Sequence, residues 1–197
     1  VCLQDGTSHY FGQKFSKAYD VKFTNKDNKD EYAYYTTWGK TTRAIAAIIM
    51  VHADDYGFVL PPRIAPKQVV IIPIGDDPEV DNLANKYNDL LNRNGIVSYI
   101  DNSDKSPGFK FAEAEVNGIP LRIEVGKRDL ESGLITLVRR DTREKIPFNK
   151  DIDILGTVHE LLETIQKDMY NKALERQNSL TFAAHSMSDI ENIINTS

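Results

Sequence analysis

Residues 69–74 read VVIIPI, an almost continuous run of β-branched side chains. Such a run is typical of a strand that is buried on both faces of a sheet. Residues 78–93 then carry apolar side chains at helical spacing, and Asn94 and Gly95 end this helix. The pattern further predicts strands at 96–100, 119–125 and 134–139, a short helix at 107–116 and a long amphipathic helix at 152–177. Because strands alternate with helices, we expect an α/β unit with a mixed, largely parallel sheet.

The first 59 residues follow another pattern: strand, hairpin, strand and then a helix. The turn-forming stretch 25–30 separates two strand-like segments, 19–23 and 32–36, and therefore predicts an antiparallel pair. A helix is expected over 42–53, and its apolar run of about eight residues is too short to cross a membrane. Residues 60–67 contain three prolines, which makes this stretch a connector suited to a domain boundary.

Arg43 stands at the start of the 42–53 helix, directly after two threonines. Either Thr41 or Thr42 can cap the helix, which leaves Arg43 in the first turn, where the helix dipole disfavours a cation. A cation kept in this position usually has an anionic partner, and the start of a helix itself attracts anions. From these residues alone, a surface arginine ahead of a buried helix is the plainer interpretation.

The charge of the chain limits how it can bind nucleic acid. The net charge is −5, which argues against a general binder of nucleic acids. Residues 105–149 form the one quarter with an excess of basic groups, nine against seven acidic. An RNA contact is therefore expected there, and it should read bases through specific groups more than through overall charge. Arg139 and Arg140 lie in this quarter, and their sequence favours neither pairing within the protein nor a phosphate contact.

Cys2 is the single cysteine, so a disulfide framework and a metal site made of cysteines alone are both excluded. This composition fits a reducing, cytoplasmic compartment. No signal peptide is visible, and the first residues read like the middle of a strand, so we expect a piece of a longer polypeptide. His52, Asp54 and Asp55 are residue types that bind metals, but the adjacent aspartates point to different faces, and no metal site is predicted.

A series of sequence blocks carries more information than any single motif. They are TSHYFGQKF (7–15), WGKTTR (38–43), MVHADDYG (50–57), LPPRIAP (60–66), QVVIIPI (68–74), PGFKF (107–111), GIPLRIEVGKRDLE (118–131) and VRRDTREK (138–145). In this order the blocks resemble a class II aminoacyl-tRNA synthetase, and more narrowly a prolyl-tRNA synthetase of the archaeal and eukaryotic type. The resemblance covers nearly all of the chain. Threonyl and histidyl enzymes share the second domain, but LPPRIAP and PGFKF favour the prolyl family.

The resemblance implies how the chain is divided. Residues 1–66 would be the end of an antiparallel-sheet catalytic core with its motif 3, and residues 67–150 an α/β anticodon-binding domain. Residues 151–177 would form a long helix that packs on or follows this domain. Residues 178–197 would begin a C-terminal domain, which in the family often binds zinc through cysteines that are not found in this stretch.

The resemblance also assigns roles to residues near the N-terminus. Arg43 would be the motif 3 arginine that binds ATP phosphates, and it would form the catalytic set together with His9. Arginine suits this task because its planar fork binds phosphate oxygens in pairs and keeps its proton. The other expected contacts to ATP are Gln4, Thr7 and Thr41. The expected contacts to proline are His9, Trp38 and Gly39, with Trp38 and Gly39 as a Trp-Gly turn that forms the wall of a small pocket.

A second set of residues in the basic quarter is implied to read the anticodon. Specific recognition of single-stranded RNA requires stacking and side chains matched to base edges, and anticodons for proline carry two important guanines. By resemblance, Phe111 stacks, Glu115 accepts hydrogen bonds, and Arg122, Arg128 and Asp129 complete the guanine contacts, the last two from a loop. Phe111 and Glu115 lie four residues apart, on one face of the short helix. Without the family, Phe111 reads as core and Glu115 with Arg122 as a weak surface ion pair.

The function that the resemblance implies is the ligation of proline to its tRNA through a prolyl-adenylate. The expected partners are proline, ATP with Mg²⁺, tRNA for proline and a second subunit in a homodimer, with no membrane. Motifs 1 and 2 of the class are missing from these 197 residues, so we expect the chain alone to be inactive. The alternative is a non-enzymatic RNA-binding accessory protein that keeps the anticodon-binding fold, although such a protein has no reason to retain an ATP site.

Overall fold

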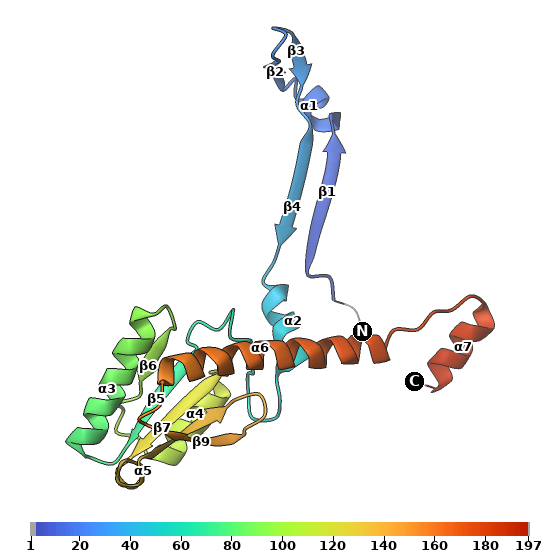
Figure 1. Cartoon of the computed structure of the whole chain (residues 1–197). Helices are drawn as coiled ribbons and strands as arrows, with labels where there is room; N and C mark the ends of the chain where they lie inside the picture. The colour runs from blue at the N-terminus through green and yellow to red at the C-terminus, as the bar shows by residue number, and fades with distance from the viewer. Residues whose placement is uncertain (1–2, 197) are drawn as a thin grey trace. The chain divides into compact units, whose positions relative to one another are not determined.

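The computed structural model describes residues 3–196, and Cys2 lies outside them. The chain divides into two compact units, Val1–Met50 and Val51–Ser197 (Figure 1). This division falls ahead of residue 66, where the sequence motifs put the end of the catalytic core. The two units are described separately below.

The first unit is built on an antiparallel pair, β1 (Gly6–Gly12) with β4 (Tyr35–Lys40). A short helix, α1 (Lys14–Ala18), and a hairpin, β2 (Lys22–Thr24) with β3 (Asp30–Tyr32), connect the two strands. The predicted pairing of 19–23 with 32–36 was therefore only partly right. The hairpin is shorter than expected, and residues 35 and 36 belong to β4, where they pair with β1 instead. Helix α2 (Arg43–His52) begins and ends one residue inside the predicted range.

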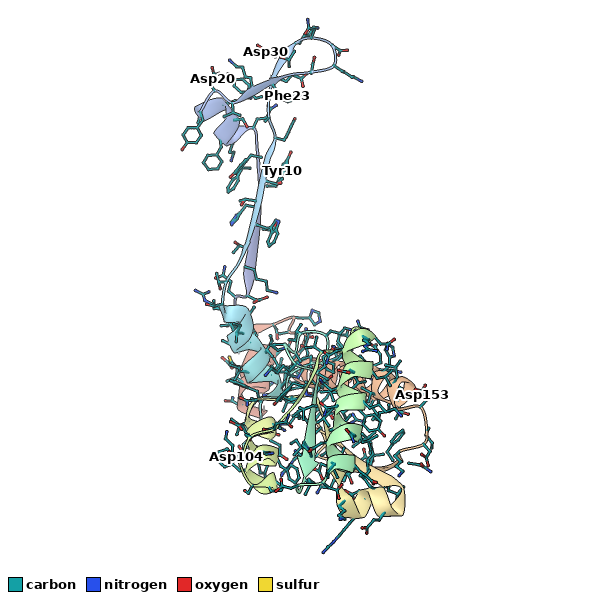
Figure 2. The ribbon with its side chains drawn as sticks, turned by 90° about the vertical axis from the view of Figure 1, so that its left-hand side faces the viewer. Tyr10, Asp20, Phe23, Asp30, Asp104 and Asp153 are labelled. Atoms are coloured by element: carbon teal, nitrogen blue, oxygen red, sulfur yellow. The ribbon has the colours of Figure 1, made fainter. Side chains whose placement is uncertain are left out.

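Side chains of the first unit are largely exposed. Among residues 3–50, Ser16 is the only buried one. Aromatic rings pack mainly on one another: the Phe11 and Phe15 ring centroids lie 4.7 Å apart, edge to face. Tyr10 and Phe23 extend from the unit with exposed fractions of 71% and 48% (Figure 2). This unit therefore has no hydrophobic core within its described residues.

The second unit contains a five-stranded sheet. The strand order is β6 (Ser98–Ile100), β5 (Val69–Ile74), β7 (Leu121–Gly126), β8 (Leu134–Arg139) and β9 (Lys145–Asn149). Strand β5 pairs in parallel with both β6 and β7, whereas β7–β8 and β8–β9 are antiparallel. The sheet is therefore mixed, as predicted, but it is not largely parallel, because two pairings are parallel and two are antiparallel.

Helices cover both faces of this sheet. Helices α3 (Pro78–Arg93) and α6 (Ile154–Ser179) pack on one face, where Ile71, Leu121 and Ile123 have no exposed surface. Helix α4 (Pro107–Val116) packs on the other face, against Val70 and Ile72. Because β5 contributes alternate residues to both cores, its continuous apolar run is explained by burial on both sides.

Four segments were predicted with the correct bounds, and three others were shifted or shortened by one or two residues at their ends. Strands β5 and β8 and helices α3 and α4 begin and end where the pattern puts them, while β6 and β7 are shorter and α6 begins at Ile154. Four elements were missed: α1, α5 (Lys127–Ser132), β9 and α7 (Met187–Thr196). Strand β9 lies at the edge of the sheet, which is where a strand tolerates a residue such as Pro147. Across residues 3–196, no helix combines the length and the apolar character needed to span a bilayer.

Candidate functional site

A small pocket at the start of α2 collects the residues that were expected to bind ATP. Gln4, Thr7, Thr41 and Arg43 line a cavity of about 260 Å³, together with Gly39. The Thr41 hydroxyl accepts a hydrogen bond of 3.3 Å from the backbone amide of Arg43, so it contributes to the start of the helix. The Arg43 guanidinium lies 3.5 Å from both oxygens of Gln4, at the outer limit of a hydrogen bond. Arg43 is exposed and can turn toward an anion in this pocket.

The residues expected to contact proline lie on two faces of the β1–β4 pair. Thr7 is opposite Gly39 and His9 is opposite Thr37, whereas Trp38 is opposite Ser8. Because side chains alternate along a strand, Trp38 points away from the face that carries His9 and Thr7. Trp38 and Gly39 lie inside β4, so the expected Trp-Gly turn was wrong. Trp38 has an exposed fraction of 79%.

An apolar pocket that sequence reasoning missed lies on the same face as His9. Its volume is about 480 Å³, and its lining includes Phe11, Phe15, Tyr19, Tyr35 and Thr37. The His9 ring stacks on Phe11 with centroids 5.3 Å apart. The aromatic residues between 11 and 35 were visible in the sequence, but the register of β1 with β4 was needed to bring them together.

The Arg43 pocket does not by itself provide a site for Mg²⁺. Asp5 is the one carboxylate among its lining residues, and it pairs with Lys40 at 2.9 Å. Within residues 3–196, no group of three or more histidine, cysteine, aspartate or glutamate side chains is arranged to hold a metal ion. In the second unit, Asp54 binds Arg140 and is not available as a metal ligand.

A cluster of charged and aromatic side chains lies on the α4 side of the five-stranded sheet. It brings together three of the five residues expected to read the anticodon: Phe111 and Glu115 from α4, and Arg122 from β7. The Arg122 guanidinium carbon lies 4.5 Å from the centre of the Phe111 ring. Its Nη1 is 3.5 Å from Oε1 of Glu115. The spacing of four residues on α4 therefore produces the shared face that was expected.

Glu124 is a fourth member of this cluster, and sequence reasoning missed it. Arg122 and Glu124 are two apart on β7, so both point to the α4 side, and Nε of Arg122 donates to Oε1 of Glu124 at 2.9 Å. Both residues are buried, with exposed fractions of 6% and 7%. Alternation along the predicted strand was the signal that could have identified Glu124. Arg122 is thus enclosed by an aromatic ring and two carboxylates.

Arg128 and Asp129 lie away from this cluster. They belong to helix α5 and not to a loop, so that expectation was wrong. Strand β7 continues from Arg122 to Gly126, and at ~3.3 Å per strand residue these four steps place the start of α5 roughly 13 Å from Arg122. Oδ2 of Asp129 accepts a hydrogen bond of 3.2 Å from the amide of Gly126, which caps the short helix. Arg128 is exposed at the carboxyl end of β7.

Arg139 and Arg140 form ion pairs within the protein. Arg140 makes two hydrogen bonds of 2.7 Å to the carboxylate of Asp54, and its Nε donates to the backbone oxygen of Glu115 at 2.9 Å. This guanidinium lowers the pKa of Asp54 to about 2. Arg139 binds Asp141 and Asp168, both at 2.7 Å. Of the two roles left open by the sequence, the structure gives both arginines the structural one.

Tyr56 and Arg143 extend the cluster toward solvent. The Arg143 guanidinium carbon lies 3.7 Å from the centre of the Tyr56 ring. Nη2 of Arg143 is 3.6 Å from Oε2 of Glu115, so Glu115 lies between Arg143 and Arg122. Both residues lie in the sequence blocks of the family, but neither was given a role, because they are 87 residues apart and their contact depends on the folded chain.

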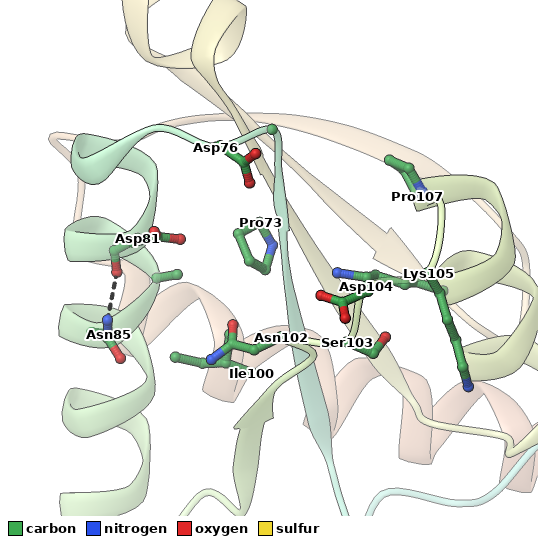
Figure 3. A pocket seen from close by; sticks show the side chains of 13 residues that line it. Pro73, Asp76, Asp81, Asn85, Ile100, Asn102, Ser103, Asp104, Lys105 and Pro107 are labelled. Atoms are coloured by element: carbon green, nitrogen blue, oxygen red, sulfur yellow. Dashed lines mark hydrogen bonds between the residues drawn. The ribbon is translucent and has the colours of Figure 1, made fainter.

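A polar crevice of about 540 Å³ lies at the carboxyl ends of β5 and β6, between α3 and α4 (Figure 3). Asp76, Asp81 and Asp104 are among its lining residues, along with Lys105 and Lys110. Lys105 pairs with Glu113 at 2.8 Å, and Lys110 donates to the backbone oxygen of Asp101 at 2.9 Å. The crevice has more carboxylates than lysines, and both lysines already have partners within the protein. It therefore suits RNA phosphates less well than the exposed surface around Tyr56 and Arg143.

Comparisons with known proteins agree with this arrangement. The family model described as "Anticodon binding domain" matches residues 68–167, which include the whole five-stranded sheet, helices α3 and α4, and the first half of α6. The chain belongs to the anticodon-binding domain family.

The anticodon-binding domain and the unit before it are both similar to proline–tRNA ligases. The ligase of Chlorobium phaeobacteroides is 46% identical over 98% of this chain, and that of Clostridium botulinum is 47% identical over 98%. A crystal structure of prolyl-tRNA synthetase from Cryptosporidium parvum, complexed with L-proline and AMP, has a TM-score of 0.87 and 37% identity over 98% of the chain. The chain spans 40% of the length of these curated relatives and 42% of the crystallised one. The resemblance seen in the sequence blocks and the α/β class with a mixed sheet are thereby confirmed.

Proposed function

We propose that this chain is part of a ligase that joins proline to its tRNA through a prolyl-adenylate formed from ATP. The observation that carries the proposal is the 46% identity to proline–tRNA ligases over 98% of the chain, across both units. Proline, ATP and tRNA for proline are the substrates. A homodimeric assembly and a cytoplasmic location go with this function as predictions.

In the first unit, the proposed chemistry is mainly positioning. Forming an adenylate requires the carboxylate of proline to meet the α-phosphate of ATP while charge on the phosphates is neutralised. Arg43 supplies a fixed positive charge with paired donors, and Gln4, Thr7 and Thr41 border the nucleotide beside it. We expect Mg²⁺ only with the ATP phosphates, and zinc only in a C-terminal domain of the kind found in the family.

The geometry favours proline contacts by His9 and Gly39 over a contact by Trp38. Gly39 lines the Arg43 pocket, and His9 shares a strand face with Thr7, so both are near the proposed nucleotide site. Trp38 points to the opposite face, so its proposed contact with the same proline has less support from the geometry. We expect His9→Ala to weaken proline binding more than Trp38→Ala does in the complete enzyme, measured as the change in KM for proline.

In the second unit, we propose that the cluster around Glu115 reads the anticodon. Phe111 is half-buried and can stack a base on its ring, and Glu115 can accept from the N1 and N2 edge of guanine. Arg122 holds both groups through its own contacts. Arg128 and Asp129, at the other end of β7, would contact a second nucleotide rather than the same base.

The test of this function is binding of the 197-residue chain to tRNA for proline and to the same tRNA with both anticodon guanines changed to adenine. Each lost base contact should weaken binding by roughly 1–3 kcal/mol at fixed salt concentration. Undiminished affinity for the altered tRNA would overturn the proposed anticodon site.

A second measurement separates the ligase from the non-enzymatic alternative. The 197-residue chain should show no proline-dependent exchange between ATP and pyrophosphate, because it spans only 40% of the length of its relatives. The complete enzyme should show this exchange and should lose it when Arg43 is changed to alanine. An accessory protein would show no exchange in any form but would still bind the tRNA.

A further inference from the structure

Two arginines flank Glu115, and they differ in how far a ligand can reach them. Arg122 has a side-chain exposed fraction of 7%, and its Nε already donates to Glu124 at 2.9 Å. Arg143 has a side-chain exposed fraction of 43%, and it contacts the other oxygen of the same carboxylate. Bidentate recognition of a base needs two free N–H donors on one edge of the guanidinium. Arg143 meets this requirement better than Arg122 does.

The surroundings of Arg143 hold its guanidinium in a defined plane. Tyr56 supports one face of it, with 3.7 Å between the guanidinium carbon and the ring centre. The backbone of Tyr56 is itself fixed, because its amide donates to Asp54 at 2.9 Å and Asp54 is bound by Arg140. Two residues further on, the amide of Phe58 donates to the backbone oxygen of Val116 at 3.1 Å. Residues 54–58 therefore hold Tyr56 beside the end of α4, next to Glu115.

The backbone at Arg143 is unusual for an arginine. Its φ is 62°, in the left-handed region that glycine adopts without cost and other residues adopt rarely. A glycine would make this turn with less strain. The side chain of Arg143 is thus kept at some cost to the turn, which is a pattern seen at functional positions.

We propose that Arg143, stacked on Tyr56, is a specificity-determining residue that reads one anticodon guanine together with Glu115. This inference rests on the proposed function of the second unit. Arg143 donates to O6 and N7 of the base, while Glu115 accepts from N1 and N2. Arg122 is then a positioning residue, which orients Glu115 and Phe111 from strand β7 without touching RNA.

The test combines a change in the protein with a change in the RNA. Arg143→Gly removes the guanidinium while favouring the left-handed turn, so this variant should fold at least as well as the unaltered chain. 7-Deazaguanine in place of each anticodon guanine in turn removes the N7 acceptor alone. For one of the two positions, Arg143→Gly should weaken binding of guanine-containing tRNA by roughly ten- to hundredfold. The same variant should lose little further affinity when that guanine is replaced by 7-deazaguanine, because the two changes remove one contact.

The control variant is Arg93→Ala, which removes an equal charge from α3 on the other face of the sheet, where Arg93 has a side-chain exposed fraction of 81%. It should leave the guanine preference unchanged. The proposal is overturned if Arg143→Gly binds as tightly as the unaltered chain, or if it weakens guanine and 7-deazaguanine tRNA by the same factor at both positions. A lack of guanine dependence in the unaltered chain would overturn the proposed anticodon function as well, so the two failures are distinguishable.

Discussion

The two units of this chain present their candidate sites in different ways. In the second unit, Glu115 lies on a helix that packs against a sheet whose central residues have no exposed surface. In the first unit, the Arg43 pocket is carried by a strand pair and a helix start with almost no buried side chains. Rigid support is what keeps site residues in a productive geometry. We therefore expect the second unit to hold its candidate site on its own and the first unit to hold only part of one.

The largest expected effect is the loss of a core side chain from the second unit. Ile71 is completely buried in β5, so Ile71→Ala should lower the free energy of unfolding by about 2–5 kcal/mol through lost burial and a cavity. The matched control is Ile45→Ala in the first unit, where Ile45 has an exposed fraction of 60% and the change should be within ~0.5 kcal/mol. Urea denaturation followed by circular dichroism measures both. Equal losses in the two variants would contradict the difference between the units.

The next effect concerns the ion pair that fixes Tyr56. Arg140→Ala removes three hydrogen bonds, to Asp54 and to the backbone of Glu115, from a side chain with an exposed fraction of 2%. The cost should be about 2 kcal/mol of unfolding free energy, since charged hydrogen bonds are lost and one acceptor is left buried. Arg128→Ala, an exposed arginine of the same unit, is the control and should change stability little. A similarly small change in the stability of Arg140→Ala would show that this ion pair does not hold residues 54–58 in place.

The same pair gives a pH dependence of stability. Arg140 holds the pKa of Asp54 at about 2 in the folded chain, below its ordinary value of 3.8. A lowered carboxyl pKa stabilises the fold above the ordinary value, and this stabilisation is lost as pH falls through the folded value. Between pH 4 and pH 2, stability of the unaltered chain should therefore fall more steeply than stability of Asp54→Asn. Because Asp54 is partly exposed, added salt should reduce this difference. Parallel pH curves for the two proteins would contradict the assignment.

How far the sequence predicts this molecule depends on how local each signal is. The β-branched run of 69–74 and the helical spacing of 78–93 are set by neighbours in the chain, and β5 and α3 have the predicted bounds. Helix α5 was missed because six residues, capped by Asp129, carry too short a periodic signal. At the site, the spacing of Phe111 and Glu115 on α4 was readable. The place of Glu124 beside Arg122 was readable in the same way, from alternation along β7, although it was missed. The contact of Tyr56 with Arg143 depends on a left-handed turn, which the sequence pattern does not show.

The smallest effect is expected for the most exposed aromatic side chain. Trp38 has an exposed fraction of 79%, so Trp38→Ala should change the stability of the 197-residue chain by less than ~0.5 kcal/mol. Thermal unfolding followed by circular dichroism measures this. A loss comparable to that of Ile71→Ala would show that the first unit has a core that depends on Trp38.

Amide hydrogen exchange with and without the anticodon stem-loop of tRNA for proline tests the central claim most directly. Exchange reports local opening residue by residue, and bound RNA slows it where contacts form. We expect protection around α4, the start of β7 and the turn at Arg143, and none over residues 3–50. Protection confined to residues 3–50, with none between 107 and 126, would contradict the assignment of anticodon reading to the second unit.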